Sequence, residues 1–379
     1  MPAADAPRPT PPTTPTSPTT PTSPAPIPLL DALAAFVPVW GPSGREEAVR
    51  SAIAAWLARH APAVEVMRVD AMGNLVTRLP ARRATGPRPP RLLLAAHMDE
   101  IGVIANHVDA AGFVRFSAVG GVPVADLVGL RVRFEGGLEG VVDIEAAARK
   151  GQPPPPPALD GLYIDVGAAG RDGCPVAVGD AAVFTGGLSW LAGGRRAMAP
   201  NMDNRAGCAA LAEALRRLAE AEPAADVFGV FTVQEEIGLR GAQTAGFGVA
   251  ADVALAVDIT GAGDLPGAAP LALALGAGAA VKLADGGMIS HRGVAEWLFE
   301  RAAAGGIPVQ REVLPGGTTD AAALQLARAG VPAGAVSIPT RHAHRPGQVV
   351  DLGDLEAVTA LLVAAGLGPF DQPWYAPED

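Results

Sequence analysis

Four short apolar runs recur along the chain, and they constrain its fold more than any other feature. They cover residues 92–96, 227–233, 253–257 and 335–338. Runs of this length without polar alternation are typical of strands buried on both faces, and helical patterns lie between several of them. The sequence therefore predicts an α/β fold with a mostly parallel sheet covered by helices.

The helical patterns cover residues 45–60, 204–220, 291–304, 319–329 and 352–365. Ser43 and Glu46 stand three positions apart at the start of the first pattern, which is the spacing of a capping box. Three later patterns end at a glycine, as helices commonly do: Gly305, Gly330 and Gly366. We therefore expect each pattern to form a helix.

The pattern changes between residues 102 and 197. Short alternating stretches at 113–116, 130–134, 162–166 and 181–184 are separated by turn residues, which indicates a compact β unit. We expect an inserted β domain at 105–197, within an α/β domain formed by residues 28–104 and 198–370. Five consecutive prolines at 153–157 fit neither a strand nor a helix and predict an exposed loop.

The two ends of the chain are predicted to be tails. Residues 1–27 are almost entirely Pro, Thr, Ser and Ala, without the basic start and apolar stretch of a signal peptide. We expect a disordered tail there and a C-terminal tail at residues 371–379. Since no apolar run reaches the roughly 18 residues of a membrane helix, no membrane partner is expected.

Charge and cysteine content limit which partners the protein can bind and which cellular compartment suits it. The formal net charge is −10 and no basic stripe is present, which argues against a nucleic-acid partner. Cys174 and Cys208 lie far apart, outside any Cys-x-x-Cys spacing, which argues against a disulfide framework and a thiolate zinc site. We therefore expect a reducing, cytoplasmic location.

Polar side chains follow the apolar runs, at the points where the strands should end. They are His97, Asp99, Glu235, Glu236, Asp258, His342 and His344, with Asp203 at the start of a helix. Because ligands gather at the carboxyl ends of parallel strands, we expect these residues to lie together. Two imidazoles and three carboxylates suit two divalent metal ions, zinc or cobalt, with room for a solvent ligand.

Two residues are expected to act beside the metal ions. Two ions that share a solvent molecule lower its pKa, so such a site produces its own nucleophile, a metal-bound hydroxide. Glu235 and Glu236 are neighbours at a strand end and point to different sides, so one can bind metal while Glu235 acts as general base. Asp99 is placed to accept a hydrogen bond from the other ring N–H of His97.

Several motifs resemble one family of peptidases. They include His97-Met98-Asp99-Glu100, Asp203-Asn204-Arg205-Ala206-Gly207, Gln234-Glu235-Glu236-Ile237-Gly238 and Gly317-Thr318-Thr319-Asp320-Ala321. Over residues 29–368 the chain is similar to the tetrahedral aminopeptidase family, which includes glutamyl and deblocking aminopeptidases. The resemblance implies peptide substrates, a zinc-peptidase-like catalytic α/β domain, and an inserted β-barrel domain used in oligomerisation. It also implies a homo-oligomer, a tetrahedral shell of twelve subunits.

The resemblance also implies a role for each site residue. The implied roles are Asp203 between two ions, His97 and Asp258 on one ion, Glu236 and His344 on the other, and Glu235 as base. A cis peptide bond between Asp203 and Asn204 is implied as well.

The histidines divide into candidates and structural residues. Spacing alone leaves open whether His342 or His344 binds metal, because both could face the same side of an extended segment. The resemblance assigns His344, since His342 stands where relatives carry an aromatic ring. We interpret His60, His107 and His291 as structural.

Two alternatives to an aminopeptidase remain. A glycosidase is one, because some relatives carry endoglucanase names and Glu235 and Glu236 are paired acids. Adjacent residues fit poorly, however, with glycosidase carboxylates, which flank the bond about 5 to 9.5 Å apart. A noncatalytic assembly protein is the other alternative, and the complete set of candidate ligands argues against it.

Overall fold

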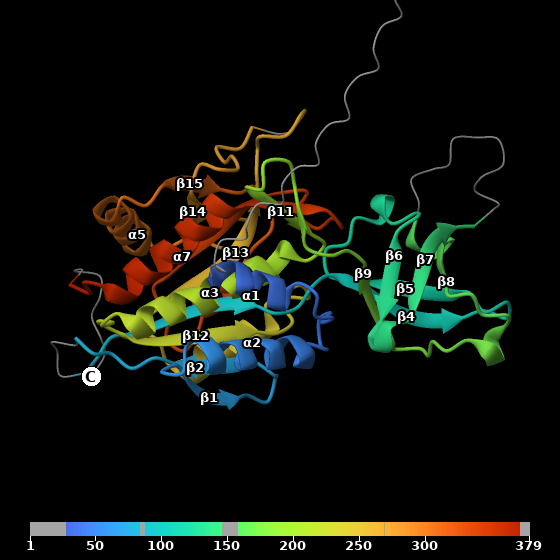
Figure 1. The fold of residues 1–379 in the computed structure, drawn as a ribbon, viewed down its shortest axis with the longest axis horizontal. Helices are drawn as coiled ribbons and strands as arrows, with labels where there is room; N and C mark the ends of the chain where they lie inside the picture. The colour runs from blue at the N-terminus through green and yellow to red at the C-terminus, as the bar shows by residue number, and fades with distance from the viewer. Residues whose placement is uncertain (1–27, 84–87, 146–157, 269, 372–379) are drawn as a thin grey trace, which may run out of the picture.

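The computed structural model describes residues 28–83, 88–145, 158–268 and 270–371 (Figure 1). At its centre four parallel strands lie in the order β12 (Asp226–Thr232), β3 (Arg91–His97), β13 (Val253–Gly261) and β16 (Ala333–Arg341). Three of these strands contain a whole apolar run, and β12 contains all of the fourth except Val233. The prediction of an α/β fold with a mostly parallel central sheet is confirmed.

Further strands extend this sheet to eleven strands. One edge carries β2 (Leu75–Arg78) and β1 (Glu65–Val69), and the other carries β17 (Gln348–Asp351), β11 (Arg196–Ala199) and β10 (Ser189–Trp190). These five strands pair antiparallel. Strand β14 (Ala279–Ala284) pairs antiparallel with β16 and parallel with β15 (Val309–Val313). Strand β10 and the first two residues of β11 thus join the main sheet, although they lie within the range 105–197.

Helices cover both faces of the central strands, which explains why the apolar runs do not alternate. On β3, Leu92 and Leu94 pack into one apolar cluster and Leu93 packs into another. The first face is covered by α1 (Pro28–Phe36), α2 (Glu47–His60), α3 (Met202–Glu220), α5 (Arg292–Gly305) and α7 (Leu352–Leu367). The second face is covered by α4 (Arg240–Val249) and α6 (Asp320–Leu324). Within the described ranges, no helix is both long and apolar enough to cross a membrane.

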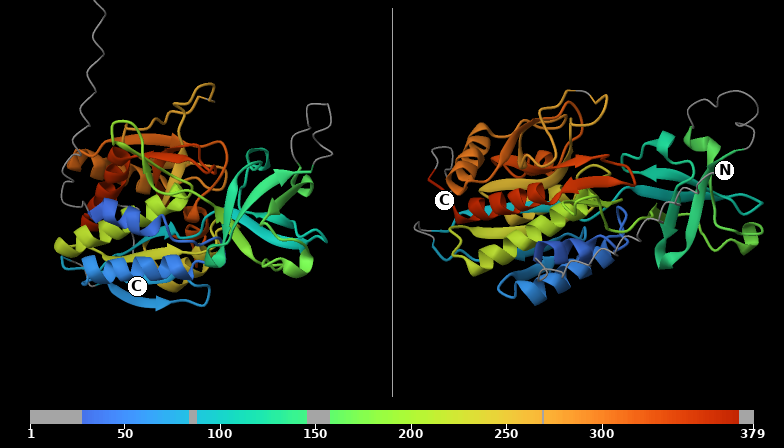
Figure 2. Two further views of the ribbon diagram at one scale, coloured as in Figure 1. Left: turned by 45° about the vertical axis from the view of Figure 1, so that its right-hand side comes forward. Right: turned by 45° about the horizontal axis from the view of Figure 1, so that its top comes forward.

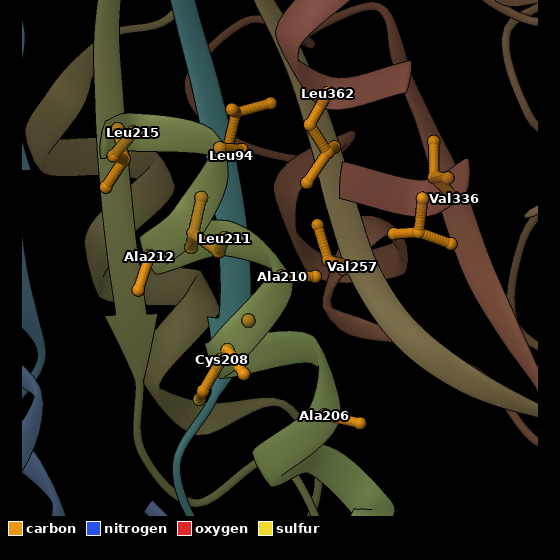
Figure 3. Packing of buried hydrophobic residues seen from close by; sticks show 14 of the residues in the cluster. Leu94, Ala206, Cys208, Ala210, Leu211, Ala212, Leu215, Val257, Val336 and Leu362 are labelled. Atoms are coloured by element: carbon orange, nitrogen blue, oxygen red, sulfur yellow. The ribbon is translucent and has the colours of Figure 1, made fainter. Parts of the chain in front are cut away.

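Helix α3 packs closely on the sheet because many of its inward residues are small. Ala210 lies beside Val257 of β13, and Leu211 lies beside Leu94 of β3 (Figure 3). All four side chains are excluded from solvent to within 1%. This contact holds the middle of α3 on the sheet, and the start of the helix lies at the carboxyl ends of β3 and β13.

Two local predictions about helices were wrong. Helix α2 has no capping box: Ser43 donates to the carboxylate of Asp99, and Glu46 accepts from the N–H groups of Gly44 and Gln234. The helix predicted at 319–329 ends at Leu324, and turns with i to i−3 hydrogen bonds follow it. At Ser43 and Glu46, partners distant in sequence take the place of the capping-box hydrogen bonds. After Leu324, tighter turns take the place of the predicted helix.

The region between β3 and α3 contains a closed six-stranded barrel (Figure 2). Its order is β4 (Gly102–Val108), β5 (Val114–Val119), β8 (Leu162–Asp165), β7 (Glu139–Ile144), β6 (Arg131–Phe134) and β9 (Ala181–Phe184). The barrel has its own apolar core and lies at the end of the sheet where β3 leads into β4. The expected inserted barrel-like unit is therefore present.

The first and last strands of the barrel pair with each other. Gly102 of β4 lies opposite Val183 of β9. A Cβ on Gly102 would lie 2.4 Å from the carbonyl oxygen of Ala182, so this close approach requires glycine. The predicted N-terminal tail, the proline loop and all but residue 371 of the predicted C-terminal tail lie outside the described residues.

Candidate metal centre

The residues singled out in the sequence, except His342, come together at the carboxyl ends of the central strands. His97 ends β3, Asp258 lies in β13, and Asp203 lies at the start of α3. Glu235 and Glu236 lie in the loop between β12 and α4, and His344 lies between β16 and β17. The peptide bond between Asp203 and Asn204 is cis, as the resemblance implied.

Asp203 lies between two groups of possible ligands. Its Oδ1 is 3.1 Å from Nε2 of His97, which is in turn 3.5 Å from Oδ1 of Asp258. Its Oδ2 is 3.2 Å from Nε2 of His344, which is 3.8 Å from Oε2 of Glu236. In each group the candidate ligand atoms lie within 4.8 Å of one another. His342 joins no such group among the described residues.

The acids of this centre are buried and crowded, which perturbs their pKa values. Burial raises the pKa of Glu235 well above its usual range, and burial together with the charge of Asp203 does the same for Glu236. Burial lowers the pKa of His97, but the carboxylates of Asp258 and Glu235 outweigh it, so the net pKa is well above the usual range. The hydrogen bond to Asp203 raises the pKa of His344 to about 10.

These shifts arise because several carboxylates and two imidazoles are buried close together. In addition, Oε1 of Glu236 is buried without a hydrogen-bond partner among the described residues. Divalent cations would neutralise the carboxylates and bind the unpartnered oxygen, because imidazole and carboxylate donors at this spacing suit such ions. The residues present therefore fit a metal centre.

Asp99 joins three segments of the site. Its Oδ2 accepts from the Ser43 hydroxyl at 2.6 Å and from the N–H of Glu236 at 3.2 Å, and its Oδ1 accepts from the N–H of Glu235 at 3.0 Å. Nδ1 of His97 lies 3.2 Å from the Asp99 carbonyl oxygen and 3.4 Å from Oδ1. Asp99 thus holds the Glu235 loop as well as contacting His97, and only the contact with His97 was predicted from the sequence.

Asp320 is a further buried acid, whose charge acts on Glu235, that the sequence did not single out. It is buried, accepts a hydrogen bond from the Thr232 hydroxyl, and its Oδ1 has no hydrogen-bond partner within the described part of the chain. Burial raises the pKa of Asp320 to about 7, and its charge contributes to the raised pKa of Glu235. The Gly317-Thr318-Thr319-Asp320-Ala321 motif was the signal available for it.

The remaining histidines lie outside the candidate ligand groups of the described residues. His60 stacks on Trp56 and lies 3.3 Å from a carboxylate oxygen of Asp31. His107 lies on barrel strand β4, and His291 precedes α5. None of them contributes to the centre.

A sequence model of the M42 glutamyl aminopeptidase family matches residues 73–361. The chain belongs to this family. A curated relative from Acetivibrio thermocellus, named provisionally as an aminopeptidase, is 38% identical over 339 residues, which are 89% of this chain and 98% of the relative. Membership confirms the resemblance and makes this M42 chain a metal-dependent aminopeptidase, a hydrolase that acts as an exopeptidase.

Solved structures of M42-like proteins have the same fold. An aminopeptidase from the archaeon Desulfurococcus kamchatkensis is 36% identical, with a TM-score of 0.82 over 89% of this chain and 94% of that chain. The TET1 peptidase of Pyrococcus horikoshii is 30% identical, with a TM-score of 0.78 over 90% of this chain and 100% of that chain. The latter is described as assembling into a tetrahedron or a large octahedral shell.

Proposed function

We propose that this centre binds two divalent metal ions and removes amino-terminal residues from peptides. The observation that supports the two-ion site is the position of Asp203, whose two oxygens each face a separate histidine. The proposed ligands are Asp203 shared by both ions, His97 and Asp258 for one ion, and Glu236 and His344 for the other. Zinc or cobalt suits this donor set.

The bound ions would lower the pKa of a water molecule between them and polarise the scissile carbonyl group. Glu235 is the proposed general base. Its Oε2 lies 4.0 Å from Nε2 of His97, and its backbone N–H is held by Asp99. A carboxylate held in this position can take a proton from the attacking water and return it to the leaving amine.

The geometry disfavours a glycosidase. Glu235 and Glu236 are adjacent on one loop, and each has an oxygen in the same group of candidate ligand atoms as His97, within 4.8 Å. Glycosidase carboxylates instead flank the sugar bond from opposite sides, about 5 to 9.5 Å apart. A noncatalytic assembly protein would not need these buried acids.

The inserted barrel is proposed to act in assembly. We propose a domain division of 28–104 with 198–370 for catalysis and 105–197 for oligomerisation, and a homo-oligomer of twelve subunits. The related TET1 peptidase, described as assembling into a tetrahedron or a large octahedral shell, supports an oligomer. The free cysteines Cys174 and Cys208 are consistent with a reducing, cytoplasmic location.

Metal removal with a peptide panel tests the proposal. Chelation should abolish release of amino-terminal residues, and added zinc or cobalt should restore it, with two ions bound per subunit. Mass spectrometry of digests should show residues lost one at a time from unblocked peptides. Early internal fragments, or activity that survives complete metal removal, would contradict the proposal.

A further inference from the structure

His344 differs from the other proposed ligands in how it is held. Its side chain is 40% exposed, whereas those of His97, Asp203 and Asp258 are at most 8% exposed. It lies in a turn with a φ of 58°, and His342 two residues earlier has a φ of 60°. Neither strand ladder nor core packing sets its ring orientation, so another contact must.

The barrel supplies that contact. Nδ1 of His344 lies 2.9 Å from the carbonyl oxygen of Gly121, 223 positions away in sequence. A carbonyl oxygen can only accept, so this bond keeps a proton on Nδ1, and Nε2, which faces Asp203, is the nitrogen that would give up its proton to bind an ion. The ring of His97 is held in the same way, with its Nδ1 beside the carbonyl oxygen of Asp99.

The same barrel segment leaves space for the two proposed ligands of one ion. A Cβ on Gly121 would lie 2.6 Å from Nδ1 of His344, and one on Gly120 would lie 3.3 Å from Oε2 of Glu236. Gly121 has no left-handed φ, so the missing side chain is what matters at this position. A second link joins the two segments, because Arg345 lies 3.0 Å from Oδ2 of Asp126.

We propose that residues 120–126 of the barrel position the metal centre, with the Gly121 carbonyl oxygen orienting His344 for its ion. The inserted barrel then serves catalysis within its own subunit, in addition to any part in assembly. The inference rests on the proposed two-ion site. The proposed contact is a backbone carbonyl oxygen, which no substitution can remove. The test therefore fills the space that Gly121 leaves beside the His344 ring.

The test compares Gly121→Ala with Gly161→Ala by titrating the metal-free proteins with Zn²⁺. Gly161 is also in the barrel, and a Cβ there meets no atom within 4 Å. We expect Gly121→Ala to bind one ion with wild-type affinity and the other about 10- to 100-fold more weakly, the typical effect of losing a contact that orients a ligand. Gly161→Ala should bind both ions as the wild type does.

A double-mutant cycle with His344→Ala keeps the test valid if Gly121→Ala folds poorly. Once the ring is absent, adding Gly121→Ala should change neither the remaining Zn²⁺ affinity nor the unfolding midpoint. The inference would be overturned if Gly121→Ala bound two Zn²⁺ ions with wild-type affinity. It would also be overturned if Gly121→Ala lowered Zn²⁺ affinity and the unfolding midpoint equally with and without the His344 ring. A wild-type protein that binds fewer than two Zn²⁺ ions would instead refute the two-ion site itself.

Discussion

Asp99→Asn is the substitution whose cost the structure defines most closely. The carboxylate accepts from the N–H of Glu235 on one oxygen, and from the N–H of Glu236 and the Ser43 hydroxyl on the other. Asparagine has one acceptor oxygen and a donor NH₂ in place of the second. Whichever way its amide is turned, one backbone N–H faces another donor, although the serine hydroxyl can rotate to accept.

The stability lost in Asp99→Asn can be worked out from the hydrogen bonds that the substitution leaves unmade. A buried donor without an acceptor costs about 1 to 3 kcal/mol, and the remaining hydrogen bonds lose the strength that a charged acceptor gives them. We therefore expect Asp99→Asn to lower the free energy of unfolding by about 3 kcal/mol. Zn²⁺ affinity should also fall about 10- to 100-fold, because the substitution releases both the Glu235 loop and a contact to His97.

Urea unfolding of the metal-free protein and Zn²⁺ titration measure the two effects. Ser43→Ala is the matched control, because it removes one donor and leaves a carboxylate that still accepts from two N–H groups. Its expected cost is about 1 kcal/mol. If Asp99→Asn unfolded and bound Zn²⁺ like the wild type, the role assigned to Asp99 would be refuted.

Three further predictions, which use four substitutions, test other residues. Glu235→Gln should retain both metal ions and lose about 10²- to 10⁴-fold in turnover, since an amide cannot accept the proton; wild-type turnover at full occupancy would point to another base. His342→Tyr should keep the metal content, whereas His344→Ala should lose one ion, and the opposite pattern in metal analysis would reassign the ligand. Burial raises the pKa of Glu46 from 4.5 to about 7, so the folded state binds more protons between those values and wild-type stability falls as pH rises through them. Glu46→Gln should therefore gain stability relative to the wild type as pH rises from about 4.5 to about 7, by up to about 3 kcal/mol. A difference in urea unfolding that did not change with pH would contradict this.

The central strands could be predicted from sequence because burial on both faces leaves a continuous apolar run. Edge strands could not be predicted in this way, because all five residues of β1 are exposed and β10 has only two residues. Their pairing comes from neighbouring strands rather than from their own composition. The barrel was visible as a β unit because its strands alternate, but closure depends on strand pairs that no local pattern contains.

The gathering of the site residues could be predicted because the carboxyl ends of parallel strands share one edge. Their ligand roles stay a prediction. The contacts around them could not be found from sequence, since Ser43 reaches Asp99 across 56 positions and Gly121 reaches His344 across 223. The capping-box prediction failed for this reason, because a local motif carries no information on a distant and stronger acceptor.

The chain enters and leaves the barrel at one place, since Gly102 pairs with Val183. A segment with adjacent ends can be excised from a gene and replaced by a short turn without stretching what remains. Here such a shortened protein would lose the acceptor at Nδ1 of His344 along with the barrel. Any engineered minimal version of this enzyme therefore needs a substitute acceptor at that atom, built on the α/β domain itself.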